Sequence, residues 1–422
     1  MGYTVVENFF LNHRTSESLE VASGRVVWIR LDIRSARDFG GASVVKHIRN
    51  EYPGETLENP AGVLFTFDCV APANNIPYAT NQQICREFAK AQGLKLFDVD
   101  AGIGSHVLIE RGYALPNSTL VGTDSHMNIL GAVGAFGQGM GDQDIAFAFR
   151  TGMTWFEVPE TLKVKLTGRL RPPVSAKDLT LLVLKKLGTV EALGKAIEYE
   201  GEAVERLDLA GRITLASMAT EMGAIISFIT PSRDILDFLK ARSGKGTLSP
   251  VLPDPDARYG KEIEIDVSDL KPQIAAPPNP ANVHDVEELE GKPIQSVFVG
   301  SCTNGRIEDF RTVAGILKGR TVSPGVILIL VPATKEVYGE MLREGLVQTL
   351  FEAGAVVSHP GCGGCASGQL GMTGKGEVQV STSNRNFPGK QGAGETYLAS
   401  PATAAASALF GRITSPEKVR VY

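Results

Sequence analysis

The stretch SVFVGSCTNGRIEDF, residues 296–310, contains the structural unit from which this chain is built. A short run of apolar and β-branched residues ends at Gly300, a polar loop with Cys302 follows, and a helical pattern begins after it. The same order of strand, polar or glycine-rich loop and helix recurs along the chain, which predicts an α/β fold with largely parallel sheets. Ligands in such folds bind at the carboxyl ends of the strands, so functional residues are expected in these loops.

Five further segments follow this pattern, and two amphipathic helices lie between them. Ser175 and Asp178 have capping-box spacing at the start of the helix expected over 175–188, and a second helix over 232–246 should end near Gly244. The segment GQGMG (137–141) lacks the rest of a nucleotide-binding fingerprint and predicts a tight turn or a close approach of a helix. The further predicted strands are GVLFTF (62–67), LKLFDV (94–99), STLVGT (118–123), AVVSHP (355–360) and EVQVST (377–382).

The length of the chain bears on its domain organisation. With 422 residues, of which 43% are hydrophobic, it can bury more than one sizeable core. The segment KPQIAAPPNPANVHD (271–285) contains four prolines and is typical of an extended surface linker. We therefore predict three α/β domains, over residues 1–160, 161–284 and 285–422.

The charge distribution limits the classes of partner. Charged residues make up 21% of the chain, the net charge is −5, and no long run has one sign, so neither nucleic acid nor a membrane surface is an expected partner. No apolar run is long enough to span a bilayer, and the N-terminal MGYTVVENFFLNHR lacks the features of a signal or transit peptide. A soluble cytoplasmic protein that binds small molecules or proteins is expected.

The cysteines are the most informative candidates for chemistry. Cys362 and Cys365 in HPGCGGC (359–365) could hold zinc, exchange a disulfide or bind an iron–sulfur cluster, and C-x2-C alone does not choose among these. Cys302, placed after a predicted strand, adds a third thiol, and three thiolates can hold three irons of a cubane while one iron stays open for Lewis-acid chemistry. The alternative is that Cys302 is simply buried, which is the expectation for Cys85 in QQICREFAK.

Several longer segments carry a resemblance to a known family. TDSH (123–126), GSCTNGRIEDF (300–310), HPGCGGC, STSNRNFPGKQG (381–392) and YLASPATAAASAL (397–409) resemble the aconitase superfamily, particularly the large subunits of isopropylmalate and homoaconitate dehydratases. The resemblance covers essentially the whole chain in the same order. It implies three α/β domains around a 4Fe-4S cluster with one open iron, and a separate small subunit that supplies a further domain.

The activity implied is that of a hydro-lyase, which removes and re-adds water on a hydroxy-dicarboxylate or hydroxy-tricarboxylate. A 3-isopropylmalate dehydratase (isomerase) large subunit with an altered substrate pocket fits the motifs. Homoaconitate, 2-methylmalate and 2,3-dimethylmalate remain alternative substrates. A non-catalytic cluster or iron sensor and an electron-transfer protein are alternatives from other classes, although the charge counts against a nucleic-acid-binding sensor.

The resemblance also implies roles for individual residues. The cluster ligands would be Cys302, Cys362 and Cys365, with Asn384 hydrogen-bonded to a cluster sulfur. The implied catalytic residues are Asp68, Asp124, His126, Glu221 and, as a substitute for a missing imidazole, His106. The implied substrate-binding residues are Ser125, Arg385, Lys390, Arg306 and Arg37.

Four positions depart from the family pattern around the substrate. Cys69 stands where relatives commonly have His, and Arg37 stands where they have His or Gln. Lys390 stands where Arg is more frequent. In GSHV the His position is taken by Ser105, with His106 one residue later. A thiol, with an ordinary pKa of about 8.5 against about 6.5 for imidazole, cannot replace His at neutral pH. These departures predict a substrate pocket that differs from that of standard isopropylmalate isomerases.

Overall fold

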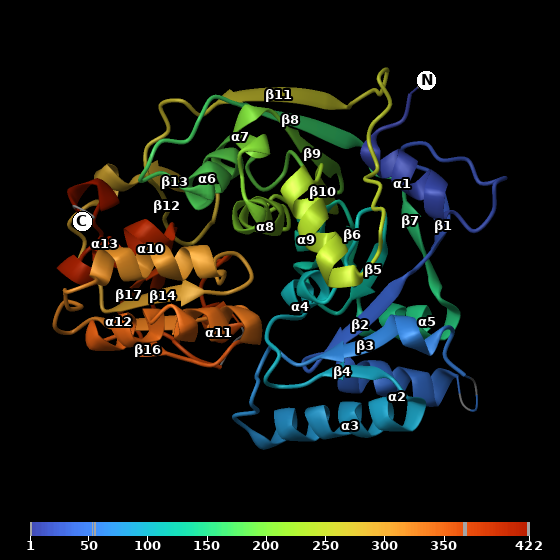
Figure 1. Cartoon of the computed structure of the whole chain (residues 1–422), viewed down its shortest axis with the longest axis horizontal. Helices are drawn as coiled ribbons and strands as arrows, with labels where there is room; N and C mark the ends of the chain where they lie inside the picture. Colours follow the sequence, from blue (N-terminus) through green and yellow to red (C-terminus); the bar gives the residue numbers. More distant parts are fainter. Residues whose placement is uncertain (1, 53, 55, 366–368, 420–422) are drawn as a thin grey trace.

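The computed structural model of the chain describes residues 2–52, 54, 56–365 and 369–419, so the end of the predicted cysteine loop, 366–368, lies outside the described residues. Within the described part, strands form sheets of five, four and seven strands and one two-stranded antiparallel ribbon, and most neighbouring strands are parallel (Figure 1). The prediction of an α/β fold with largely parallel sheets is confirmed. The ribbon pairs β1 (Val26–Arg30) with β7 (Met153–Glu157), next to α1 (Val5–His13).

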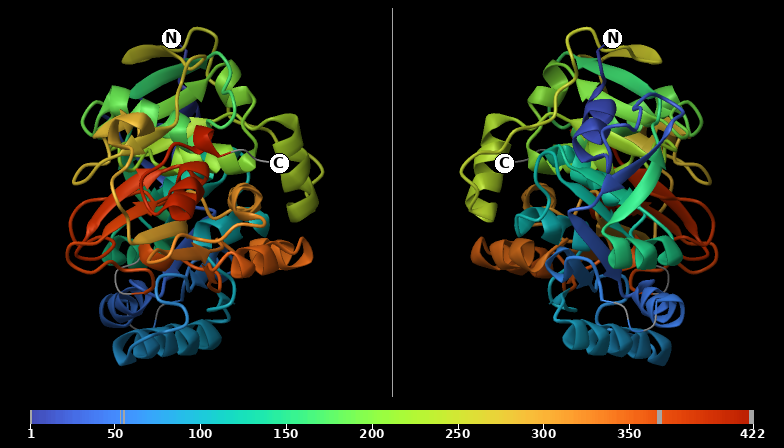
Figure 2. Two further views of the ribbon diagram at one scale, coloured as in Figure 1. Left: turned by 90° about the vertical axis from the view of Figure 1, so that its left-hand side faces the viewer. Right: turned by 90° about the vertical axis from the view of Figure 1, so that its right-hand side faces the viewer.

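The five-stranded sheet contains the first three predicted strands. Its order is β4-β3-β2-β5-β6, and all of its pairs are parallel. Its helices α2 and α3 lie together at the lower end of both side views (Figure 2), and the fully buried Cys85 on α3 is the core cysteine expected. The elements are β2 (Ile33–Arg37), β3 (Val63–Thr66), β4 (Lys95–Phe97), β5 (Thr119–Gly122), β6 (Phe136–Gly139), α2 (Gly41–Glu51), α3 (Ile76–Gln92), α4 (Gly104–Glu110) and α5 (Asp142–Thr151).

The four-stranded sheet, of order β10-β9-β8-β11, is also parallel throughout. Both predicted helices belong here: α6 has the capping box of Ser175 with Asp178, and α9 ends at Gly244 in a left-handed conformation. The elements are β8 (Thr161–Thr167), β9 (Ala196–Glu200), β10 (Ile226–Ile229), β11 (Lys261–Asp266), α6 (Ala176–Leu187), α7 (Glu202–Glu205), α8 (Leu209–Ser217) and α9 (Arg233–Ser243).

The seven-stranded sheet has the order β13-β12-β18-β17-β14-β15-β16, and its last five strands in that order are mutually parallel. It contains the other three predicted strands. Its elements are β12 (Gln273–Ala275), β13 (Val283–Asp285), β14 (Ser296–Gly300), β15 (Ile327–Val331), β16 (Val356–Val357), β17 (Val378–Ser381), β18 (Glu395–Ala399), α10 (Ile307–Leu317), α11 (Lys335–Arg343), α12 (Leu346–Glu352) and α13 (Pro401–Phe410).

The expectation of a surface linker over 271–285 is wrong. The segment contains two strands, β12 and β13, which pair with each other, and β12 also pairs with β18. Ile274 and Ala275 in β12 are fully buried. The prolines at 277–280 occupy the turn between the two strands. The predicted boundary between 284 and 285 therefore falls inside β13, and the division into three domains stays a prediction.

Backbone contacts join the five- and seven-stranded sheets where their parallel strands end. Cys362 N donates to Asp68 O at 2.9 Å, and Ile103 N donates to Ala333 O at 2.7 Å. Within the five-stranded sheet, a Cβ on Gly139 would lie 2.3 Å from Asp124 O, so only glycine allows this approach. Most of the segment GQGMG is the strand β6 rather than a turn, and the predicted close approach of a helix occurs at Gly137, where a Cβ would lie 2.1 Å from Met127 O at the start of a 3-10 helix (Met127–Val133).

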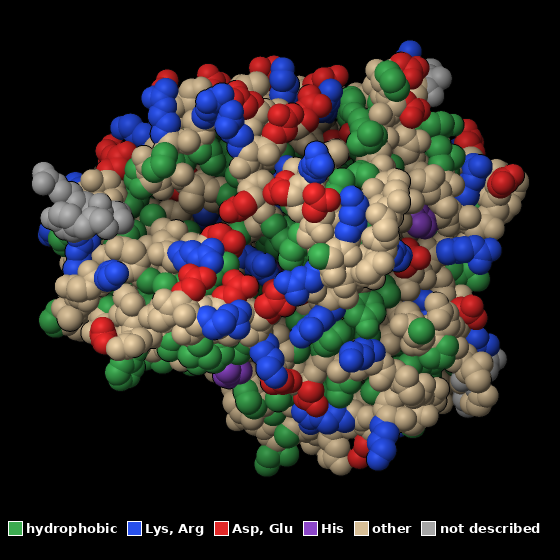
Figure 3. All heavy atoms as spheres, viewed as in Figure 1, with side chains coloured by type: hydrophobic (Ala, Val, Ile, Leu, Met, Phe, Trp, Pro, Cys, Tyr) green, Lys and Arg blue, Asp and Glu red, His purple; other side chains and the backbone are tan. Residues whose placement is uncertain are grey.

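The outer surface shows mixed charge on the face in Figure 3, where Lys and Arg side chains are interspersed with Asp and Glu. Among the described residues, no helix combines the length and the apolar character that crossing a membrane requires.

The capping box of α6 provides a stability test of the sequence-based prediction. Ser175 Oγ accepts from Lys177 N and donates to Asp178, so Ser175→Ala should lower the free energy of unfolding by about 1 kcal/mol, measured by urea denaturation. Ser232→Ala is the matched control, since Ser232 at the N-terminus of α9 makes no capping hydrogen bond, and it should change stability by less than about 0.5 kcal/mol. Equal effects of the two substitutions would contradict the prediction.

Candidate active site

Loops from two sheets surround a cavity of about 390 Å³. They follow β2, β3 and β5 of the five-stranded sheet and β14, β16 and β17 of the seven-stranded sheet, so the candidate residues in them lie at the carboxyl ends of parallel strands. The lining residues are Arg37, Phe39, Cys69, Tyr78, Ile103, Thr123, Asp124, Ser125, His126, Cys302, Cys362, Cys365, Arg385 and Lys390.

The three candidate cluster cysteines, Cys302, Cys362 and Cys365, line this one cavity although 63 residues of sequence (302 to 365) separate the first from the last. Cys302 follows Ser301, whose φ of +73° is unusual for a residue with a side chain and turns the chain sharply after β14. Burial raises the pKa of the Cys302 and Cys365 thiols. A set of three thiols in a shared cavity fits an iron–sulfur cluster, because thiolates are its protein ligands.

Polar side chains surround the sulfur of Cys302. Asn384 Oδ1 lies 3.4 Å from Cys302 Sγ, and Asn384 Nδ2 donates to Ser217 Oγ at 2.7 Å. Ser217 Oγ is itself 3.8 Å from the sulfur. Groups of this kind hold a thiolate ligand in orientation and adjust its charge. Ser217 was missed by sequence reasoning, because only the packing of α8 against the loop after β14 brings it here.

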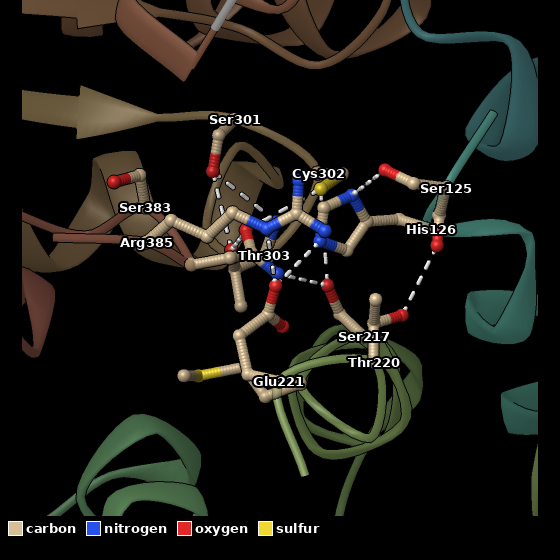
Figure 4. Close-up of polar contacts among 12 residues, drawn as sticks. Ser125, His126, Ser217, Thr220, Glu221, Ser301, Cys302, Thr303, Ser383 and Arg385 are labelled. Atoms are coloured by element: carbon tan, nitrogen blue, oxygen red, sulfur yellow. Dashed lines mark hydrogen bonds and ion pairs between the residues drawn. The ribbon is translucent and has the colours of Figure 1, made fainter. Parts of the chain in front are cut away.

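Glu221 binds two cationic or protonatable groups at once (Figure 4). Its Oε1 is 3.1 Å from His126 Nε2 and accepts from Arg385 Nε at 2.8 Å, while Ser125 Oγ lies 3.3 Å from His126 Nδ1. Burial acts to raise the pKa of Glu221, but His126 and Arg385 outweigh it, so this pKa lies below its ordinary value. Both ring nitrogens of His126 therefore have fixed partners, which orients the imidazole toward the cavity.

Arg37 contacts three segments at the other side of the cavity. Its Nε donates to Asp68 at 2.6 Å, Nη1 donates to Asp124 at 2.9 Å, and Nη2 is 2.7 Å from Cys362 Sγ. Burial raises the pKa of Asp68 to about 6, although Arg37 opposes the rise. For Asp124, Arg37 followed by His126 outweighs burial and lowers the pKa. The two carboxyl groups that Arg37 binds therefore have pKa values shifted in opposite directions.

Two buried charged side chains support the loops from behind. Asp38 accepts from the backbone N–H groups of residues 68, 69 and 70 at 2.9–3.2 Å. Lys177 Nζ donates to the carbonyl oxygens of Thr382 and Ser383, just before Asn384, at 3.0 and 2.8 Å. In the sequence, Lys177 was indistinguishable from an exposed lysine in the first turn of a helix, so sequence reasoning missed it.

Five candidates lie outside the cavity lining, and three of them, Asp68, Glu221 and Asn384, contact side chains that line it. The other two are His106 and Arg306. His106 on α4 is fully buried, its Nε2 is 2.9 Å from Cys302 O, and burial, followed by Arg306, lowers its pKa to about 3. Arg306 pairs with Glu110 at 2.5 Å. This placement differs from the expectation of an imidazole at the substrate, because the register of α4 turns His106 toward the Cys302 backbone. The remaining candidates line the cavity or contact residues that do.

Comparison with known proteins agrees with these motifs. The family model described as Aconitase family (aconitate hydratase) matches residues 67–411. The chain is 44% identical to 3-isopropylmalate dehydratase large subunit 1 of Methanopyrus kandleri, over 99% of both chains. It is 43% identical to the homoaconitase large subunit of Thermus thermophilus, over 99% of this chain and 98% of that one. The chain therefore belongs to the aconitase family, as its motifs predicted.

Proposed function

We propose that this chain is the cluster-carrying large subunit of a hydro-lyase that dehydrates and rehydrates a hydroxy-dicarboxylate, of the 3-isopropylmalate dehydratase type. The observation that supports this is the meeting of three thiols, a His–Glu pair and the side chains of Arg385 and Lys390 in one cavity. Relatives named as 3-isopropylmalate dehydratase large subunits, aligned over the full length of both chains, add support.

The cluster ligands in this proposal are Cys302, Cys362 and Cys365, with Asn384 beside the first sulfur. When bound, a 4Fe-4S cluster with one open iron supplies a Lewis acid at the substrate oxygens. His106 holds the Cys302 backbone from the far side, through its contact with the carbonyl oxygen. The role of the protein at this end of the cavity is to hold the ligands and exclude bulk water.

Substrate carboxylates are bound by Arg385 and Lys390, which line the same cavity as the cysteines. Arg385 has its Nε engaged by Glu221, which fixes the plane of the guanidinium and leaves the far nitrogens for a carboxylate. Lys390 adds a point charge without a fixed fork, so its contact is less directional. Ser125 contributes a hydroxyl at the cavity wall. A dianionic substrate matches this arrangement.

Proton transfer is assigned to His126. Its Nε2 faces Glu221 and its Nδ1 faces Ser125, so a proton can be held on the ring beside the departing hydroxyl. Glu221 stays ionised because its pKa is lowered, and it therefore stabilises the protonated ring. Asp124 accepts a hydrogen bond from His126 N at 3.0 Å and so holds the loop after β5 in place. The guanidinium of Arg37 balances the negative charge of Asp124.

The substrate pocket is proposed to differ from that of standard isopropylmalate isomerases at Arg37 and Cys69. Both line the cavity, where the family pattern has His or Gln at position 37 and His at position 69. The guanidinium keeps Asp68 paired. The Cys69 thiol adds no titratable group near neutral pH, since a hydrogen bond with Cys362, followed by burial, raises its pKa. Homoaconitate is the second candidate substrate, because relatives include a homoaconitase large subunit aligned over 98% of its length.

A small subunit is proposed to cover the cavity and supply the base that the large subunit lacks. The relatives are named large subunits, and Phe39, which lines the cavity, is 68% exposed. In this proposal the second chain covers Phe39 together with the mouth of the cavity. Much of the substrate choice then belongs to that second chain.

The proposal is tested by anaerobic reconstitution of the chain with its small subunit and an absorbance assay on unsaturated dicarboxylates of increasing side-chain size. Gain or loss of a double bond that depends on iron is expected for the complex, and little activity for the isolated chain. A fully assembled cluster with no turnover of any substrate would contradict a hydro-lyase and favour a sensor. Turnover of isopropylmalate at rates normal for the family would contradict the altered pocket.

Cluster uptake by cysteine variants tests the ligand set separately. Cys302→Ala, Cys362→Ala and Cys365→Ala should each abolish the visible absorption of the reconstituted cluster and lower the bound iron and sulfide, because each removes a thiolate ligand. Cys85→Ala, in the core of the five-stranded sheet, is the control and should keep the full cluster content. Normal iron content in any of the three ligand variants would contradict the assignment.

The role of Arg385 in binding carboxylates predicts a specific kinetic change. Arg385→Lys keeps the charge but loses the fork held by Glu221, so KM should rise about tenfold while kcat falls less. Steady-state kinetics of the reconstituted complex measure this. Arg311→Lys is the control, because Arg311 pairs with Glu344 on the surface, and it should leave both constants unchanged. A fall in kcat at constant KM would instead assign Arg385 to the transition state alone.

A further inference from the structure

The side chain of Cys69 points toward Cys362, and the two sulfurs are close. The Sγ atoms of Cys69 and Cys362 and a carboxylate oxygen of Asp68 all lie within 4.8 Å of one another. Both cysteines are nearly buried, with 7% and 9% of their surface exposed, yet both line the cavity. A small oxidant that enters the cavity can therefore reach both sulfurs.

The backbones of the two loops are also held side by side. Cys362 N donates to Asp68 O at 2.9 Å, and Gln369 Nε2 donates to Ala71 O at 3.3 Å. His359 Nε2 contacts the same carbonyl of Ala71. These hydrogen bonds hold the loop that carries Cys69 against the loop that carries Cys362, and the sulfurs are already within 4.8 Å of one another.

We propose that Cys69 and Cys362 form a reversible disulfide when the cluster is absent. This inference rests on the proposed function only in that Cys362 is a cluster ligand. Because one sulfur cannot serve both purposes, the disulfide and the cluster exclude each other. The pair protects a ligand thiol from irreversible oxidation and makes cluster assembly depend on a reductant.

Oxidised glutathione, a small disulfide, supplies the oxidising equivalents for this reaction. The Cys362 thiolate attacks one glutathione sulfur, which forms a mixed disulfide and releases one glutathione thiolate. The Cys69 sulfur then attacks the Cys362 sulfur and gives up its proton, which forms the Cys69–Cys362 bond and releases the second glutathione as a thiol. The two protein thiols lose two electrons and two protons, and one glutathione disulfide becomes two thiols.

Mass spectrometry of the full chain tests the bond directly. In the background Cys85→Ser with Cys365→Ser, the tryptic peptides 50–86 and 344–375 each contain one cysteine, Cys69 and Cys362. The cluster-free chain is treated with oxidised glutathione, free thiols are alkylated, and the protein is digested without reductant. A cross-linked peptide pair that disappears after reduction is expected. Adding Cys69→Ser to this background should instead leave glutathione on Cys362.

The native sequence supplies the decisive comparison. Fragmentation of the cross-linked peptides from the unsubstituted chain should again identify Cys69 with Cys362. A bond of Cys362 to Cys365 or Cys302 in its place, or full alkylation of Cys69 after oxidation, would overturn the proposal.

Cluster assembly gives a second readout. The oxidised chain should take up no cluster from iron and sulfide until a dithiol reductant is added, and a chain loaded with cluster before oxidation should show no cross-link. If the reduced chain takes up no cluster either, the proposed function fails, whereas the peptide result still decides the disulfide. Full cluster uptake by the cross-linked chain would overturn the mutual exclusion.

Discussion

The buried guanidinium of Arg37 is the contact on which the arrangement of the site depends. It lies at the end of β2 and binds Asp68 after β3, Asp124 after β5 and the sulfur of Cys362 from the seven-stranded sheet. The side chains of the two aspartates are at most 5% exposed, so without a cation they would be uncompensated buried charges. Breaking such an arrangement by removing one partner costs several kcal/mol, of order 3–5. Arg37 therefore holds the loops of two sheets at one position.

The rest of the site is a set of loops whose backbones are fixed from behind. Asp38 binds the turn that carries Asp68 and Cys69, and Lys177 binds the carbonyls that precede Asn384. These supports come from rigid elements, so the side chains that face the cavity can change while the frame stays the same. The departures expected at positions 37 and 69 are of this kind: a cation stands where the family pattern has His or Gln and a thiol stands where it has His, while Asp68 stays paired. The same exchange creates the short distance between Cys69 and Cys362.

Sequence patterns predicted the local elements well, because strand and helix periodicity depends on near neighbours. All six strands named from the sequence are present, and the Ser175 capping box formed as expected. The segment 271–285 was misread because its prolines suggested an exposed linker, whereas partners distant in sequence bury its ends as strands. His106 was expected at the cavity because it lies one residue after the position of the family's His. It lies on the helix α4, where each residue turns the side-chain direction by a fixed angle, and its ring faces Cys302 O instead.

The sequence by itself determined the α/β class, the family, and which loops carry the thiols and cations, since these follow from local patterns and characteristic motifs. Only the tertiary structure decided that Glu221 lies between His126 and Arg385, that Arg37 joins three loops, and that Cys69 meets Cys362. Each of these contacts joins residues at least 31 positions apart, the shortest being Arg37 with Asp68. Their side chains meet because separate sheets place the ends of their parallel strands at one cavity, and no local pattern records which side chains will be opposite one another.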